Sequence, residues 1–132
     1  MKLFICIDEK FGMMFNNRRQ SKDREVIAKI NEILAGNELY ITEYSKSLFD
    51  KGIVCENFER CEGYVFIENP DLIVSDNIEE LYIFKWNRHY PSDKKLNIDL
   101  SDYKMIDTED FVGYSHEKIT LERYVKENAK WN

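Results

Sequence analysis

The spacing of apolar residues predicts a buried strand followed by an amphipathic helix. Residues 3–7 form an unbroken apolar run with branched and aromatic side chains, which is typical of a strand covered on both faces. Apolar residues then recur every three or four positions across residues 22–35, as on one face of a helix. Ser21 is the expected N-cap of this helix, and Gly36 its expected left-handed end.

Later segments rich in Val, Ile, Tyr and Phe predict further strands. They are residues 39–44, 63–67, 81–86, 103–106 and 116–125. A strand, helix, strand opening with an antiparallel pair at the C-terminal end indicates an α/β fold. We expect a three-layer sandwich with a mixed, mainly parallel sheet.

Composition indicates a single domain covering residues 1–132, because 43% hydrophobic residues are enough for one core. The net charge of −6 and the pI near 5.0 argue against general binding to nucleic acids or anionic membranes, although a local basic patch remains open. The first apolar run is too short for a signal peptide or a membrane span. We therefore expect a cytoplasmic protein.

The few cysteines and histidines argue against a disulfide framework or a metal site. Cys6, Cys55 and Cys61 lack a CxxC spacing and read as free or buried thiols. The acidic group around His116 has no known ligand spacing, so no metal is expected. Neither His89 nor His116 has a nucleophilic partner that the sequence can place, and no catalytic residue is assigned.

Two stretches resemble dihydrofolate reductases. IDEKFGMMFNNRRQSKDREVIAKI (residues 7–30) is similar to the start of that family, where the first strand leads through Asp-Glu and Asn-Asn into a helix. Residues 80–124 are similar to its end, with a Leu-Tyr-Ile strand, a Leu-Ser-Asp-Tyr stretch and a final Glu-Arg strand. The resemblance implies a dihydrofolate reductase-like fold with a reduced cofactor subdomain.

The FN-x-RRQS-x-D stretch at residues 15–23 also resembles short, uncharacterised bacterial proteins, some of which are labelled ribonuclease Z. A nuclease of that class needs a histidine-rich metal motif to activate water. Two isolated histidines cannot provide one, so the residues do not support that label.

Asp23 matches the position at which the family's first helix carries the carboxylate that holds the pterin. The alternative is that Asp23 only stabilises the helix N-terminus. In the family, a Thr in the Leu-Tyr-Ile-Thr strand hydrogen-bonds this acid, and here Phe84 stands in its place. Loss of that hydroxyl weakens the implied pterin role.

The family's nicotinamide cofactor depends on a glycine run after the central strand, because glycine lets the backbone approach the pyrophosphate. Here the chain reads Glu68, Asn69, Pro70. The carboxylate repels phosphates and proline lacks an amide donor, so this turn is not expected to bind a dinucleotide.

The family's Gly-Arg-x-Thr motif is altered in the same direction. Thr42 and Glu43 replace its first two residues, and only Ser45 keeps a hydroxyl. The chain is also shorter in the adenine-binding region, within residues 49–64. These departures predict that no cofactor is bound and that ordinary hydride transfer is lost.

Two further groups of residues are candidates for ligand contact. Arg18, Arg19, Lys22 and Arg24 lie close to Asn16 and Asn17 and could hold a phosphate, or form only a solvated charge run. Trp86 begins an aromatic and cationic group that could stack a base, or belong to the core and rim of the sheet.

We therefore expect a non-catalytic binder of a pterin or nucleotide-like small molecule. The ligand would lie between the loop of residues 8–20 and the first helix. The candidate contacts are Asp8, Asn16, Asn17, Arg18, Arg19, Asp23, Phe84 and Trp86. Alternatives are an active NADPH-dependent reductase completed by a homodimer partner, or a small RNA- or protein-interaction module using the surface of residues 18–24.

Overall fold

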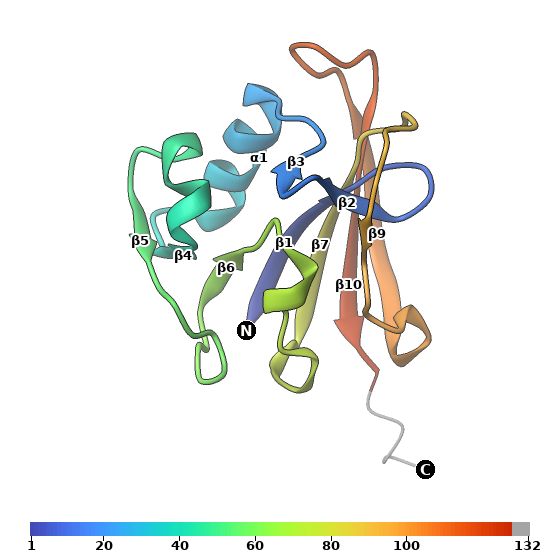
Figure 1. Cartoon of the computed structure of the whole chain (residues 1–132). Coiled ribbons are helices and arrows are strands. Elements are labelled where there is room, and N and C mark those ends of the chain that lie inside the picture. Colours follow the sequence, from blue (N-terminus) through green and yellow to red (C-terminus); the bar gives the residue numbers. More distant parts are fainter. Residues whose placement is uncertain (128–132) are drawn as a thin grey trace.

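The computed structural model describes residues 1–127 and shows a central sheet with one helix packed against it (Figure 1). The sheet has seven strands in the order β5-β4-β6-β1-β7-β10-β9. Strands β5, β4, β6, β1 and β7 are parallel, and β10 runs antiparallel between β7 and β9. The predicted α/β class, with a mixed and mainly parallel sheet, is confirmed.

The elements follow one another in chain order, with short 3-10 helices (η) between several strands. They are β1 (Lys2–Ile7), β2 (Gly12–Phe15), β3 (Arg18–Arg19), α1 (Arg24–Leu34), β4 (Leu39–Ile41), η1 (Glu43–Leu48), β5 (Gly52–Val54), β6 (Tyr64–Phe66), η2 (Pro70–Leu72), η3 (Ser75–Asn77), β7 (Glu80–Lys85), β8 (Lys94–Lys95), η4 (Leu100–Asp102), β9 (Tyr103–Phe111) and β10 (Ile119–Lys126).

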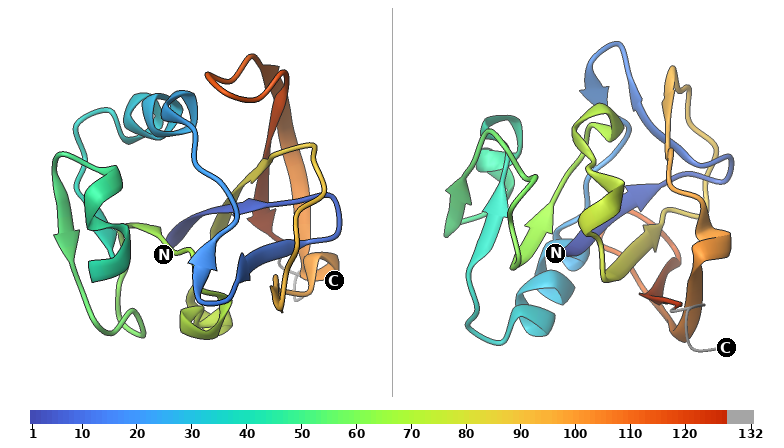
Figure 2. Two further views of the ribbon diagram at one scale, coloured as in Figure 1. Left: turned by 45° about the horizontal axis from the view of Figure 1, so that its top comes forward. Right: turned by 90° about the horizontal axis from the view of Figure 1, so that it is seen from below.

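Each face of the sheet is covered by a different layer. On one face, α1 places Val26, Ile30 and Leu34 against Phe4 and other aromatic side chains of the sheet. On the other face, loop residues such as Ile78 cover the opposite side of β1 and β7. Figure 2 shows α1 and the turns of residues 70–77 on opposite sides of the sheet. Burial on both faces explains why β1 is a continuous apolar run.

The helix boundaries differ from the predicted ones at both ends. Its N-cap is Asp23 rather than Ser21, because the Asp23 carboxylate accepts the N–H of Glu25 at 2.9 Å. At the other end Ala35, not Gly36, is the left-handed C-cap, with φ of 48°. Gly36 follows with φ of 89°.

Several predicted strands are shorter or begin elsewhere. The strand expected at residues 39–44 ends at Ile41, because Thr42 caps the 3-10 helix η1 and turns the chain. The last strand begins at Ile119, so His116 lies in the turn before it. The strands β2 and β5 were missed, since each is short and lacks a clear alternation.

Strands β3, β2 and β8 form a separate three-stranded sheet next to the carboxyl end of β1. Asn16 and Asn17 join β2 to β3, with φ of 51° and 60°. Two consecutive left-handed residues are typical of a tight hairpin turn, and asparagine tolerates this conformation. In the part of the chain described, no helix has the length and apolar character needed to cross a bilayer.

Candidate functional site

The candidate site lies at the carboxyl ends of the central parallel strands. Strands β6 and β7 flank β1 on opposite sides, and Asp8, Glu68 and Trp86 follow closely on the ends of these three strands. Ligands of open α/β sheets bind in the crevice at such an edge. A cavity of about 20 Å³, enough for one water molecule, lies here. Its lining residues are Cys6, Met13, Arg19, Gln20, Ser21, Lys22, Asp23, Val26, Ile27, Leu48, Phe66, Glu68 and Trp86.

Asp23 is buried and its carboxylate is fully occupied by groups of the protein. Oδ1 accepts the backbone N–H groups of Glu25 and Tyr114, at 2.9 and 2.8 Å. Oδ2 accepts the backbone N–H of Ser115 at 2.9 Å and lies 2.8 Å from Nδ1 of His116. Asp23 therefore joins the start of α1 to the turn between β9 and β10.

Gly113 makes this close approach of the turn possible. A Cβ atom at this position would lie 2.6 Å from Oδ2 of Asp23 and 2.8 Å from Cδ1 of Ile119. Burial opposes ionisation of Asp23, but the His116 hydrogen bond and the backbone donors outweigh it and hold its pKa below the usual range. The carboxylate is thus ionised and hydrogen-bonded at neutral pH.

His116 is buried beside Asp23 and links it to two hydroxyl groups. Its Nε2 atom lies 3.1 Å from Oγ of Ser21 and 3.0 Å from the hydroxyl of Tyr90. The Trp86 ring stacks on the imidazole with centroids 4.6 Å apart. Because a carboxylate can only accept, Nδ1 carries the proton toward Asp23. In the neutral form of the imidazole, Nε2 is then the acceptor for a hydroxyl.

Arg19 and Glu68 form a two-contact ion pair across the cleft. Arg19 Nε donates to Glu68 Oε1 at 2.6 Å, and a second guanidinium nitrogen donates to Oε2 at 3.0 Å. The Ser45 hydroxyl also donates to Glu68 Oε2, at 2.7 Å. Tyr44 lies under the guanidinium, 4.5 Å from ring centroid to Cζ. The hydrogen bond to Glu68 raises the pKa of Arg19, although burial opposes it.

Asp8 is also saturated, and it organises the loop that follows β1. It accepts the backbone N–H groups of Lys10, Gly12 and Tyr90 and the side-chain amide of Gln20. Burial opposes ionisation, but these donors together lower the pKa of Asp8. Its carboxylate is therefore a structural centre that holds three chain segments together.

The side-chain oxygen of Gln20 accepts no hydrogen bond from the residues described. Its Nε2 donates to Asp8 at 3.1 Å and to the carbonyl of Pro91 at 3.2 Å. Its Oε1 is buried and has no hydrogen-bond partner in the described part of the chain. A buried acceptor without a donor costs roughly 1–3 kcal/mol, so a group that donates to it gains that energy.

The remaining predicted residues fall outside the cavity. Asn16, Asn17 and Arg18 are exposed at the β2–β3 turn, where the asparagines have a conformational role. Phe84 is fully buried in the core under α1 and is not among the residues that line the cavity. Its role as a ligand contact stays a prediction.

The residues that the resemblance predicts at altered cofactor positions have local structural roles. Thr42 caps η1 by accepting the N–H of Ser45, and Asn69 caps η2 by accepting the N–H of Asp71. Pro70 is the first residue of η2, a position where its missing N–H costs nothing. Glu43 is exposed. Thr42 and Asn69 thus each cap a separate 3-10 helix.

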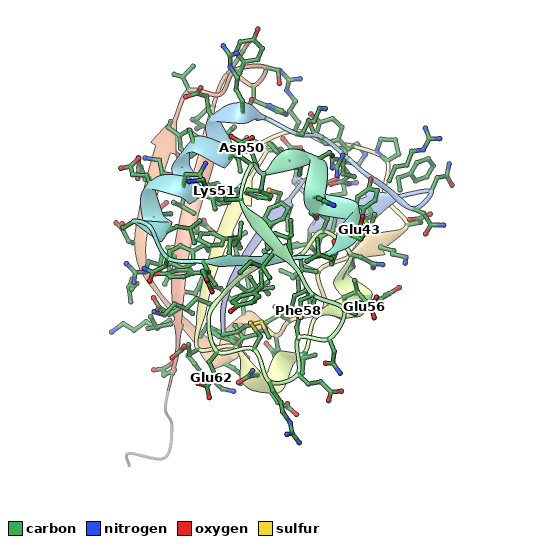
Figure 3. All side chains as sticks on the ribbon, turned by 90° about the vertical axis from the view of Figure 1, so that its left-hand side faces the viewer. Glu43, Asp50, Lys51, Glu56, Phe58 and Glu62 are labelled. Atoms are coloured by element: carbon green, nitrogen blue, oxygen red, sulfur yellow. The ribbon has the colours of Figure 1, made fainter. Side chains whose placement is uncertain are left out.

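The face over β5 and η1 carries exposed charges of both signs, with Lys46 of η1 and Arg60 among the cations. Figure 3 shows Glu43, Asp50, Glu56 and Glu62 distributed over this face together with Lys51. All five side chains are exposed, and four of the five are carboxylates. None of these five residues lines the cavity.

The predicted basic cluster is dispersed in the structure. Arg19 is paired with Glu68, and Arg24 lies over the Tyr114 ring at 3.6 Å from the centroid. Arg18 and Lys22 are exposed. Among residues 1–127, no group of histidine, cysteine and carboxylate side chains is arranged to hold a metal ion.

Sequence reasoning missed the Ser21, His116 and Gln20 contacts. The sequence pattern predicts Ser21 as the helix cap and His116 within the last strand, and it gives no reason to expect contact between them. Their hydrogen bond joins residues 95 positions apart. Residues so far apart in the sequence form no local pattern from which their contact could be predicted.

No protein-family model and no curated protein matches the chain. Among solved structures, the chain is similar to dihydrofolate reductase from Enterococcus faecalis complexed with NADP(H) and RAB-propyl. The TM-score is 0.70 at 12% sequence identity, and the match covers 96% of each chain. The similarity confirms the dihydrofolate reductase-like fold expected from the sequence, and at this identity it shows the fold alone.

Proposed function

We propose that this protein binds a small heterocyclic molecule of the pterin or nucleotide-like class in the cleft beside Asp23, and that it does not transfer hydride from NADPH. The observation that carries the proposal is the buried Oε1 of Gln20, which lacks a donor among the residues described and belongs to a residue lining the cavity. Pterins and nucleobases carry amino or ring N–H groups that satisfy such an acceptor.

The walls of the cleft suit a flat ligand. Met13, Phe66 and Trp86 contribute apolar and aromatic surface, and Arg19 and Glu68 add charge. Ligand sites typically combine an apolar lining with a few polar groups that fix orientation. In the free protein the cavity has room for about one water molecule, so the ligand enters by widening it and displacing that water.

The expected ligand contact shifts from Asp23 to Gln20. Both oxygens of Asp23 already accept donors from Glu25, Tyr114, Ser115 and His116. A pterin paired to Asp23 would have to displace the turn that contains Gly113, at the cost of several charge-assisted hydrogen bonds. Binding through Gln20 leaves that turn in place.

The proposed loss of hydride transfer is supported by the contacts of the residues that stand where the family binds its cofactor. Glu68 and Ser45 bond to each other, and Arg19 pairs with Glu68, so these groups satisfy one another. A phosphate placed here would have to break the ion pair and meet the Glu68 carboxylate.

A thermal-shift panel with folate, guanosine monophosphate, NADPH and a short single-stranded RNA tests the proposal. A ligand at one hundred times its Kd stabilises the protein by about 2.7 kcal/mol, which raises Tm by roughly 10 °C for a domain of this size. We expect folate or the nucleotide to do so, and NADPH to have no effect. Titration calorimetry then gives the Kd of the hit.

Two variants locate the ligand. Gln20→Met removes the acceptor at similar side-chain volume, and we expect it to weaken binding about tenfold. Arg18→Ala removes an exposed charge outside the cavity and leaves the Kd unchanged. Stabilisation by NADPH with consumption of dihydrofolate supports the reductase alternative instead. A shift with RNA alone supports the interaction module, and no shift at all refutes small-molecule binding.

A further inference from the structure

The hydrogen bonds around His116 form a chain from a serine to a carboxylate. Ser21 Oγ lies 3.1 Å from Nε2 of His116, and Nδ1 of His116 lies 2.8 Å from Oδ2 of Asp23. The order hydroxyl, imidazole, carboxylate, each within hydrogen-bond reach of the next, is the connectivity by which proteins activate a serine nucleophile. Ser21 is partly exposed and lines the cavity.

We propose that Ser21 is a nucleophile activated by His116 and positioned by Asp23, and that it is acylated by small activated carboxylic esters. This activity goes beyond ligand binding at Gln20. The two ideas can fail separately, because acylation is read out as a covalent mass change on Ser21.

The reaction balances with water as the only co-substrate. Ser21 Oγ forms a bond to the ester carbonyl carbon while its proton passes to Nε2 of His116. The ester C–O bond then breaks, and that proton moves to the departing alkoxide oxygen. Water next adds to the acyl group on Ser21, giving a proton to Nε2. The acid leaves and the proton returns to Oγ.

The surroundings hold the imidazole in one orientation. Asp23 fixes Nδ1 and is itself held by the backbone N–H groups of Tyr114 and Ser115. The Trp86 ring packs parallel to the imidazole with an interplanar angle of 22°. A fixed base next to an ionised, buried carboxylate stabilises the imidazolium that forms when Ser21 reacts.

The cleft next to Ser21 suits a small acyl group. Val26, Ile27 and Leu48 provide apolar surface in the same cavity. The helix α1 begins at Arg24, three residues after Ser21, so the short segment before the helix fixes the position of Ser21 at this cavity. The narrow cavity limits the acyl group to a short chain.

Tyr90 competes with Ser21 for the same nitrogen. The Tyr90 hydroxyl lies 3.0 Å from Nε2, and a neutral imidazole has one lone pair there. When Tyr90 donates, Ser21 is not activated. Tyr90→Phe leaves Ser21 as the hydroxyl partner of Nε2 and is expected to raise the rate of acylation.

Labelling with an alkyl fluorophosphonate, followed by intact mass spectrometry and peptide mapping, tests the proposal on the full chain. We expect one adduct, on Ser21, with hydrolysis of p-nitrophenyl acetate blocked in parallel. Ser21→Ala should abolish the adduct and Ser47→Ala, at an exposed serine outside the cleft, should keep it. His116→Gln should slow labelling at least about 100-fold, with its fold checked by circular dichroism.

The rate of Ser21 labelling in Tyr90→Phe separates a catalytic role of the His116 contact from a merely structural one. For an activated Ser21, Tyr90→Phe labels faster than the wild type, because Ser21 is then the hydroxyl partner of Nε2. The proposal is overturned if folded wild-type protein shows no adduct on Ser21. It is also overturned if Ser21→Ala hydrolyses p-nitrophenyl acetate as fast as the wild type, or if Tyr90→Phe labels no faster.

Discussion

Asp23→Asn is the substitution that tests the site most directly. The change keeps the size of the side chain but replaces one oxygen with an NH₂ group. Asparagine is a good N-cap, so its oxygen can still accept the N–H of Glu25. The NH₂ group then faces the donors of Ser115 and His116, which lie 2.9 and 2.8 Å from Oδ2 in the wild type.

The expected loss follows from these contacts. Hydrogen bonds to a charged group contribute about 1.5–3 kcal/mol each, and two of them are lost. We therefore expect the free energy of unfolding at pH 7 to fall by about 3–6 kcal/mol, a large part of the roughly 5–15 kcal/mol typical of a domain. The turn after β9 should detach first, because Asp23 joins it to α1.

Acid should lower the stability of the wild type and of Asp23→Asn to different extents. The pKa of Asp23 is lower in the folded chain than its ordinary value of 3.8. Its contribution is therefore complete above about pH 5 and is lost as the pH falls toward the folded pKa. The wild type should lose stability steeply below about pH 4. Asp23→Asn should show a shallower decline, because only Asp8 and other acids then contribute.

Urea unfolding followed by circular dichroism between pH 2 and pH 8 measures both effects. Asp99→Asn is the matched control, because Asp99 also caps a short helix through its carboxylate but is exposed. It should cost no more than about 1 kcal/mol. If Asp23→Asn stays within 1 kcal/mol of the wild type at pH 7 and keeps the same acid dependence, the account of the site is wrong.

Three further substitutions probe separate parts of the structure by urea unfolding. Gly113→Ala should lower the free energy of unfolding by about 1–3 kcal/mol, because the new Cβ crowds Asp23 and Ile119. A stability equal to that of the wild type would show that the turn can move to make room for it. Ala35→Gly should stabilise by about 1 kcal/mol, since φ of 48° suits glycine, and a loss would contradict the left-handed cap. Glu68→Gln should lower the free energy of unfolding by about 1–2 kcal/mol, because it weakens the ion pair with Arg19. An unchanged urea unfolding curve would contradict the presence of this pair in solution.

Much of the fold could be predicted because its signals are local. The apolar run of β1, the three- and four-residue spacing of α1 and the branched side chains of β7 each reflect burial of neighbouring residues. The Asn16–Asn17 turn also had a local signal, two adjacent residues that tolerate left-handed backbone, but these were interpreted as ligand contacts. The predicted start of the helix differs from the observed one because Ser21 and Asp23 are both good N-cap residues.

The sequence by itself determined the α/β class and the helix, because periodicity and residue type act over a few positions. Only the tertiary structure decided what the polar residues do. Asp23 meets His116 across 93 positions, and Arg19 meets Glu68 across 49. Such pairs form because the sheet brings distant loops to one edge, and hydrogen bonds there depend on distances that no local pattern encodes.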